Sequence, residues 1–166
     1  MTTIDNVSVG EENVTKTLFS VQVPLTLTED DLDNILTCCF EGGSNYWIES
    51  VEVVDLDYKG AYYPSEVPSR GGALNIYVNS GDGGDFLKDG LNICQNAKGW
   101  YFVVTSQTLM DGVARFAQLG RLKIDQIYEE AKKRPLSGGT VYTLDLDGED
   151  ADCILQLALF NAIIYG

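Results

Sequence analysis

The pattern of hydrophobic and polar positions predicts a first helix beginning near residue 29. Apolar side chains recur at i, i+3, i+4, i+7 and i+8 across positions 32–40, the spacing of one buried helical face. Thr28 precedes three acidic residues, as expected for an N-cap followed by the electropositive first turn of a helix. Gly42 and Gly43 predict the helix end, because glycine readily adopts the positive φ of a C-terminal cap.

Three more helices are predicted in the second half of the chain. Residues 106–119 carry an apolar stripe behind Ser106, the expected N-cap, and residues 123–133 show a second helical pattern. Residues 149–164 are apolar on nearly every side, so we expect this helix to be central in the fold. The apolar side of the 106–119 helix is predicted to hold Leu109, Met110, Val113, Phe116 and Ala117.

Runs with a period of two, rich in β-branched and aromatic residues, predict the strands. They lie at 16–27, 46–56, 71–78 and 100–105, with a weaker run at 141–146, while residues 86–94 fit a short helix weakened by Gly90. The mixed order of these elements predicts an α+β fold. We expect about four strands in an antiparallel or mixed sheet, packed by four to five helices.

The chain length favours one domain. Residues 1–13 are polar and are expected to form a flexible N-terminus, and residues 14–166 are expected to form a single α+β domain. No apolar stretch reaches the roughly 20 residues of a membrane span, and the N-terminus lacks the pattern of a signal peptide. We therefore expect a cytoplasmic protein that does not enter a membrane.

The net charge further narrows the classes of function that fit this chain. The chain has 25 Asp and Glu against 11 Lys and Arg, no His, and a formal charge of −14. Direct nucleic-acid binding is not expected, because counterion release requires Lys and Arg against phosphate. Residues 1–60 hold twelve acids and two bases, whereas residues 61–166 hold thirteen acids and nine bases. The charge is therefore concentrated around the first helix and the second strand.

The usual signatures of catalysis are missing from the sequence. Without His, a Ser or Cys nucleophile would depend on Lys, Asp or Glu as its base. The four cysteines show no CxxC spacing, so we expect no zinc, and Cys39 and Cys153 fall on apolar helix faces as reduced, buried side chains. We predict a protein that is not an enzyme and that needs no cofactor.

Five carboxylates fall within residues 145–152. Their spacing does not fit an EF-hand, because Gly148 comes at position 4 and Gln156 at position 12. An irregular divalent-cation site is one interpretation of this cluster. The other, which we favour, places the acids at the positive end of the last helix, with Asp147 or Asp150 as its N-cap.

Two motifs together resemble a known group of proteins. The first is the segment 40–47 (FEGGSNYW), and the second is 150–160 (DADCILQLALF) with the terminal 163–166 (IIYG). Between them, residues 105–112 form a weaker helix-start motif. This layout is similar to a family of small, largely uncharacterised proteins encoded by tailed phages and prophages of Gram-positive bacteria. The resemblance implies a phage gene product that acts inside a bacterial host cell.

The corner between the first helix and the second strand is a candidate recognition site. Glu41, Asn45, Tyr46 and Trp47 come together there, and Tyr and Trp offer large contact areas with a polar handle. The alternative is a structural turn with Trp47 in the core, which we favour.

The leading hypothesis is an inhibitor of a bacterial defence system, an anti-CRISPR-like acidic protein that binds a basic surface of a host protein. Self-association is also open, because several aromatic residues are expected to be exposed. The predicted partner-binding residues are Asp30, Asp31, Asp33, Glu41, Asn45, Tyr46, Glu49, Glu52, Asp55 and Asp57.

The alternative hypothesis is a small-ligand binder, such as a sponge that sequesters a nucleotide immune signal. Basic residues concentrate between Lys98 and Arg134, where they could hold a phosphate beside an aromatic ring. A solvated helix whose charges pair with one another explains the same residues. The predicted nucleotide-binding residues are Arg115, Arg121, Lys123 and Tyr128.

Overall fold

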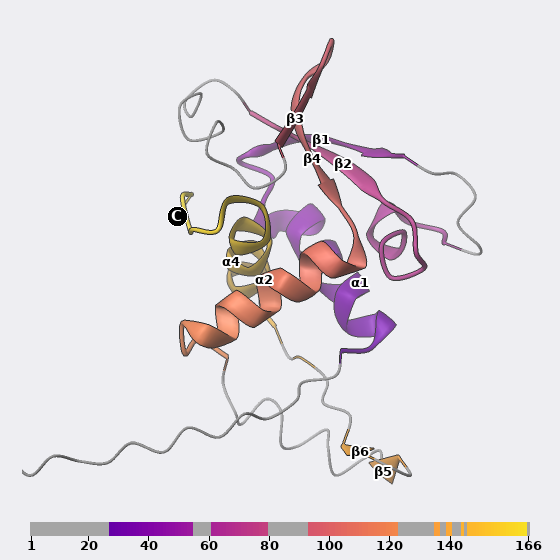
Figure 1. The fold of residues 1–166 in the computed structure, drawn as a ribbon, viewed down its shortest axis with the longest axis vertical. Coiled ribbons are helices and arrows are strands. Elements are labelled where there is room, and N and C mark those ends of the chain that lie inside the picture. Colours follow the sequence, from indigo (N-terminus) through magenta and orange to yellow (C-terminus); the bar gives the residue numbers. More distant parts are fainter. Residues whose placement is uncertain are drawn as a thin grey trace, which may run out of the picture.

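A four-stranded antiparallel sheet packs on three α-helices in the computed structural model, which confirms the α+β class (Figure 1). The structure describes residues 27–54, 61–79, 93–122, 144 and 146–165, and the backbone of two short segments at 135–136 and 139–140. The predicted helix at 123–133, the flexible residues 1–13 and all but the last residue of the predicted strand at 16–27 lie outside this part. Within it there are three α-helices rather than four or five.

The main sheet has the strand order β1-β2-β4-β3, and every neighbouring pair is antiparallel. β1 is an edge strand and carries a register irregularity between Ile48 and Ser50. A separate two-stranded sheet pairs β5 with β6. The strands are β1 (Ile48–Val53), β2 (Leu74–Val78), β3 (Ile93–Asn96), β4 (Gly99–Val104), β5 (Pro135–Leu136) and β6 (Gly139–Thr140).

Helix α1 (Glu29–Cys38) begins as the sequence predicts. The Thr28 side chain accepts a hydrogen bond from the Asp31 backbone N–H, and the Asp31 carboxylate accepts one from the Thr28 backbone N–H. The predicted end is wrong in its mechanism, because neither Gly42, with φ 172°, nor Gly43 adopts the left-handed conformation of a C-terminal cap. Instead, the chain continues through a π-helical turn, η1 (Cys39–Gly43). A Cβ on Gly43 would lie 2.6 Å from the carbonyl oxygen of Gly148, so close packing explains this glycine.

Helix α2 (Ser106–Gln118) confirms the second predicted helix, but its N-cap is Thr105 and not Ser106. Leu109, Val113 and Phe116 are buried as expected, whereas Met110 and Ala117 are exposed. The ambiguous segment 86–94 is resolved only at its end, where Cys94 belongs to strand β3. Residues 64–66 form a short 3₁₀ helix, η2 (Pro64–Glu66).

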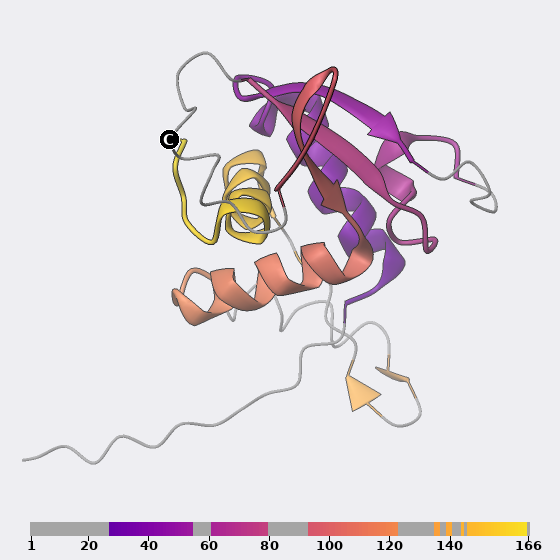
Figure 2. The same ribbon diagram turned by 45° about the horizontal axis from the view of Figure 1, so that its top comes forward.

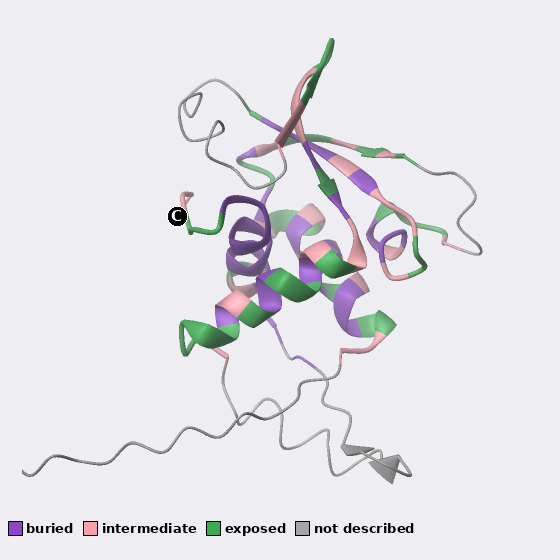
Figure 3. Ribbon diagram, in the orientation of Figure 1, coloured by how far each residue is buried: buried purple, intermediate pink, exposed green. Residues whose placement is uncertain are grey.

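Helix α4 (Gly148–Phe160) runs through the centre of the described core, with every residue from 151 to 160 buried (Figure 3). It ends at Phe160 rather than at 164, because Asn161 adopts the left-handed conformation with φ 57°. Both views place α1, α2 and α4 on one side of the sheet (Figures 1 and 2). Gly112 of α2 permits a close helix crossing, since a Cβ there would lie 2.6 Å from the carbonyl oxygen of Ile154.

Candidate functional site

Asp152 is a buried carboxylate that joins the predicted recognition corner to helix α4. Its Oδ1 accepts hydrogen bonds from Ser44 Oγ at 2.5 Å and from Trp47 Nε1 at 2.7 Å. Its Oδ2 accepts from Tyr46 OH at 2.9 Å and from Gln156 Nε2 at 2.7 Å. Four donors thus offset the cost of burying a charge that has no cationic partner among them. Trp47 is 1% exposed, so the interpretation of this residue as core is confirmed.

Gln156 extends the Asp152 cluster to the C-terminal segment. Its Oε1 accepts from the backbone N–H groups of Ile164 and Tyr165, each at 2.7 Å, and its Nε2 also donates to the Tyr165 carbonyl. The Tyr165 ring stacks on Trp47 with centroids 5.5 Å apart and an interplanar angle of 2°. One buried amide therefore satisfies backbone groups of a segment that has left the helix.

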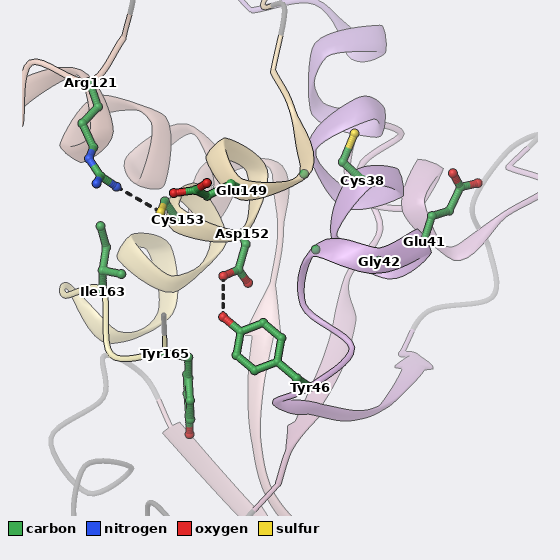
Figure 4. Close-up of a pocket in the computed structure, with 12 residues that line it drawn as sticks. Cys38, Glu41, Gly42, Tyr46, Arg121, Glu149, Asp152, Cys153, Ile163 and Tyr165 are labelled. Atoms are coloured by element: carbon green, nitrogen blue, oxygen red, sulfur yellow. Dashed lines mark hydrogen bonds between the residues drawn. The ribbon is translucent and has the colours of Figure 1, made fainter.

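A pocket with a volume of about 880 Å³, here called the corner pocket, opens beside this cluster (Figure 4). Tyr46 and Arg121 approach α4 from two sides, Tyr46 bonded to Asp152 and Arg121 donating to Cys153 Sγ at 3.1 Å. Burial and the neighbouring Asp152 raise the pKa of the Tyr46 hydroxyl. The lining of the corner pocket includes the acids Glu41, Glu149 and Asp152.

The pocket thiols do not have the electrostatic setting of nucleophiles. Burial raises the pKa of Cys153 even though the Arg121 charge acts in the opposite direction. Burial also raises the pKa of Cys38, and the charges of Glu41 and Asp147 add to that effect. A catalytic cysteine needs a lowered pKa to supply thiolate at neutral pH, so these surroundings do not favour nucleophilic catalysis.

The two described residues of the predicted nucleotide site, Arg115 and Arg121, make different contacts in the structure. Arg115 donates through one guanidinium nitrogen to the Leu157 and Ala158 carbonyls, at 2.8 and 3.4 Å, near the C-terminal end of α4. A cation is favourable there because the helix end carries unpaired carbonyls and a negative partial charge. Arg121 lines the corner pocket, while Lys123 and Tyr128 lie outside the described residues.

An acidic stripe follows the outer side of α1. Asp30, Asp33, Thr37 and Glu41 are spaced three or four residues apart, which places them along one helical face. Asp30 and Glu41 are exposed, Asp33 is half-buried, and Glu41 points away from Asp152 and Tyr46 in Figure 4. Asp31 does not belong to this surface: it is 2% exposed, and its Oδ1 accepts from the Leu144 backbone N–H at 2.8 Å.

The predicted acids of β1 do not form one surface with α1. Glu52 lies on the sheet face opposite the helices, where it accepts from Tyr77 OH and pairs with Lys98 Nζ, both at 2.9 Å. Those contacts lower the pKa of Glu52, chiefly through the Lys98 hydrogen bond. Glu49 is exposed at the irregularity of β1, and Asn45 is exposed before the strand. Asp55 and Asp57 lie outside the described residues.

A second pocket, here called the acidic groove, lies beside the stripe and has a volume of about 660 Å³. Asp33 and Thr37 come from α1, Phe40 and Glu41 from η1, Val51 from β1, and residues 63–66 from the segment around η2. No Lys or Arg is found among the described residues that line it. The groove therefore combines apolar side chains with acidic ones, and no basic side chain of its described lining offsets their negative charge.

Asp33 is an acid of the groove whose surroundings disfavour its negative charge. Its Oδ1 is inaccessible to solvent and has no hydrogen-bond partner among the described groups. Burial raises the pKa of the Asp33 carboxyl, while a hydrogen bond from Ser69 and the charge of Arg70 act to lower it. Burial outweighs both, so ionised Asp33 is an incompletely compensated charge.

The described acids of the run at 145–152 lie in α4 or at its N-cap. Asp147 is the N-cap, accepting from the Asp150 backbone N–H at 2.9 Å, as one of the two predicted alternatives. Asp152 is 6% exposed and faces the core, so the favourable charge at the helix entrance does not account for this acid of the run. Within the described ranges, no group of three potential ligands is placed to hold a metal ion, and Asp145 lies outside them.

The sequence patterns do not predict the pairing of Asp152 with Gln156. Two polar residues spaced i, i+4 inside an otherwise apolar helix were the available signal, because buried polar groups require partners. The other partners of Asp152 come from residues 105 to 108 positions away, which local spacing does not identify.

Comparisons with protein-family models, with curated proteins and with solved structures found no match to this chain. Across the part of the chain that the structure describes, the helices are too short or too polar to span a bilayer.

Proposed function

We propose that this chain is a non-enzymatic, phage-encoded interaction protein that inhibits a bacterial defence system by occupying a basic surface of a host protein. The observation that carries the proposal is the acidic stripe of α1 beside a groove of the same sign. Asp30 and Glu41 are exposed and make no hydrogen bond or ion pair with other described residues. Their charge is therefore available to a partner.

Electrostatics gives this surface a physical role. A chain of charge −14 is repelled by nucleic acid. It is attracted to the basic grooves with which other proteins bind nucleic acid. Complementary charge accelerates encounter and disfavours wrong partners, and salt screens both effects. A small acidic protein seated in a basic groove would exclude the nucleic acid that the groove normally binds.

The test uses phage infection of a bacterium with an active CRISPR defence, with the protein expressed in the host. We expect it to restore plaque formation, and the Asp30→Asn, Asp33→Asn, Glu41→Gln variant to lose most of that effect. The matched control, Glu29→Gln, Asp111→Asn, Glu149→Gln, removes the same charge from exposed positions outside the groove. Equal losses in both variants would show that total charge, not the acidic stripe, is responsible.

Binding to the purified effector complex then tests the electrostatic mechanism. We expect affinity to fall at least tenfold between 50 and 300 mM salt, since exposed charges are screened over roughly 10 Å at 0.1 M. An affinity that does not change with salt would contradict docking through the acidic stripe. Restored plaque formation without binding to the effector complex would show that this complex is not the target.

The second candidate function is sequestration of a nucleotide signal in the corner pocket. Its support is one cation, Arg121, in an 880 Å³ cavity that also contains the rings of Tyr46 and Tyr165. The three carboxylates in the same lining oppose an anionic ligand. Thermal-shift measurements with cyclic and linear nucleotides separate the candidates, because a ligand at 100 times its Kd stabilises by about 2.7 kcal/mol.

A further inference from the structure

We propose that the acidic groove is a receptor for one arginine side chain of a protein partner, held between the Tyr63 ring and the carboxylates of Asp33, Glu41 and Glu66. This inference rests on the proposed function and specifies the contact at its centre. It concerns the groove between α1, η1, β1 and residues 63–66, which include η2.

The walls of the groove fit the two parts of an arginine side chain. Phe40 and Val51 are half-buried and offer apolar surface for the methylene stem. The Tyr63 side chain is 68% exposed and lies at the groove, so a guanidinium plane can stack on its ring. Aromatic and apolar walls distinguish this cavity from a plain cluster of acids, which would suit a hydrated cation.

The carboxylates fit the charged end of the same side chain. Asp33 is half-buried and lines the groove, so its carboxylate can accept a hydrogen bond from a donor that enters there. Glu66 is oriented by the protein itself, because its Oε2 accepts from the Tyr62 backbone N–H at 2.6 Å. Glu41 is exposed and also lines the groove. Guanidinium, with five donors in a planar fork, matches several acceptors better than ammonium does.

Arg70 identifies the competing interaction. It is exposed and is not among the residues lining the groove, yet its charge is near enough to lower the pKa of Asp33. A bound guanidinium would meet this like charge. Replacing Arg70 with Gln should therefore strengthen binding of a cation in the groove, because a repelling charge near Asp33 is removed.

The probes are three capped tripeptides with Arg, Lys or citrulline at the centre, followed by amide chemical shifts of the isotope-labelled full chain. We expect the arginine peptide to shift the amides of Thr37, Val51 and Tyr63, and the neutral citrulline peptide to shift none. The lysine peptide should bind more weakly than arginine. Equal shifts with citrulline, or arginine shifts that map outside the groove, would overturn the proposal, and lysine binding as tight as arginine would overturn its planar geometry.

Two pairs of variants locate the binding. Asp33→Asn should weaken the arginine peptide about tenfold, the effect of one charge-assisted hydrogen bond, while Asp30→Asn on the same helix should change it less than twofold. Tyr63→Leu should weaken it, while Tyr62→Leu should not, because Tyr62 is 88% exposed and does not line the groove. Amide spectra that retain their dispersion show that each variant is folded. Equal effects within either pair would contradict the groove.

The two proposals fail in different ways. If the arginine peptide binds the groove but the protein has no effect on phage infection, the receptor site stands and the counter-defence function falls. If infection is restored equally by the parent and by Tyr63→Leu, and the arginine peptide does not bind, the docking function stands without this receptor site.

Discussion

The indole Nε1–H of Trp47 donates to the Asp152 carboxylate over 2.7 Å, which links the turn after α1 to the middle of the central helix. The same carboxylate accepts from Ser44, Tyr46 and Gln156. Helix α4 therefore does more than fill the core with apolar side chains. It fixes the corner that begins β1 through one buried charge, and the first prediction concerns that charge.

Substitution of Asp152 should destabilise the protein strongly. Asp152→Ala leaves four donors without their acceptor, and we expect a loss of at least about 3 kcal/mol in the free energy of unfolding, measured by urea denaturation. Asp152→Asn retains one carbonyl oxygen for Ser44 and Trp47 and should lose less. Tyr46→Phe, which removes one donor from a residue that is 55% exposed, serves as the mild control. A loss below 1 kcal/mol for Asp152→Ala would contradict the central role of this cluster.

The adjacent glycines of η1 should differ in how much an alanine destabilises the protein. Gly43→Ala places a Cβ 2.6 Å from the Gly148 carbonyl oxygen, and we expect a cost of about 1–3 kcal/mol from overpacking. Gly42→Ala meets nothing within 4 Å, and its φ of 172° is accessible to any residue, so its cost should be much smaller. Thermal unfolding of the two variants tests the close approach directly, and similar melting temperatures would argue against it.

Gln156→Glu should make stability depend on pH. The substitution removes the donor to Asp152 Oδ2 and places a second carboxylate within hydrogen-bond distance of the first. Like charges at that distance raise the folded pKa of the pair, so the cost is present when both are ionised and falls as acid protonates one of them. We expect clear destabilisation at pH 7 relative to the parent, with the difference shrinking toward pH 4–5. Gln156→Ala, without the charge, should show no such recovery.

Asp33→Asn should stabilise the protein slightly at neutral pH. Burial raises the folded pKa of Asp33 above its ordinary value of 3.8, so the folded state binds the proton more tightly than the unfolded chain does. This carboxyl therefore lowers stability as the pH rises through the window from 3.8 to the raised folded pKa. Asn is permanently neutral, so the difference in unfolding free energy between variant and parent should grow in favour of Asn from pH 3.5 to 7. A difference that is constant over that range would refute the shift.

The adjacent cysteines should differ in their reaction with iodoacetamide. Burial raises the pKa of Cys39 to about 12, and this side chain is 0% exposed, whereas Cys38 is half-buried and lines the corner pocket. Thiolate is the reactive form, so alkylation at pH 8 should label Cys38 well before Cys39. Peptide mass spectrometry of a time course distinguishes the two sites, and labelling in denaturant provides the reference in which both react.

Local patterns identified much of this fold because they depend on near neighbours. The Thr28 cap, the buried face of α1, the strand at 100–105 and the burial of residues 151–160 each follow from periodicity or from a cap three residues away. Errors came where a contact is distant. The sequence predicts a helix cap at Gly43, whereas the close approach of Gly148 requires this glycine. It predicts that Asp152 lies at a helix entrance, whereas the Asp152 carboxylate binds the turn after α1.

The sequence by itself determined the class of fold, the strong negative charge and the helix that carries the acidic stripe. Only the tertiary structure decided which acids are available to a partner. Asp31 is bonded inside the fold and Glu52 is paired on the far face of the sheet, whereas Asp33 and Glu41 meet Tyr63 at one groove. The reason is physical: spacing along the chain sets which face of an element a side chain occupies, but packing between elements sets what that face meets.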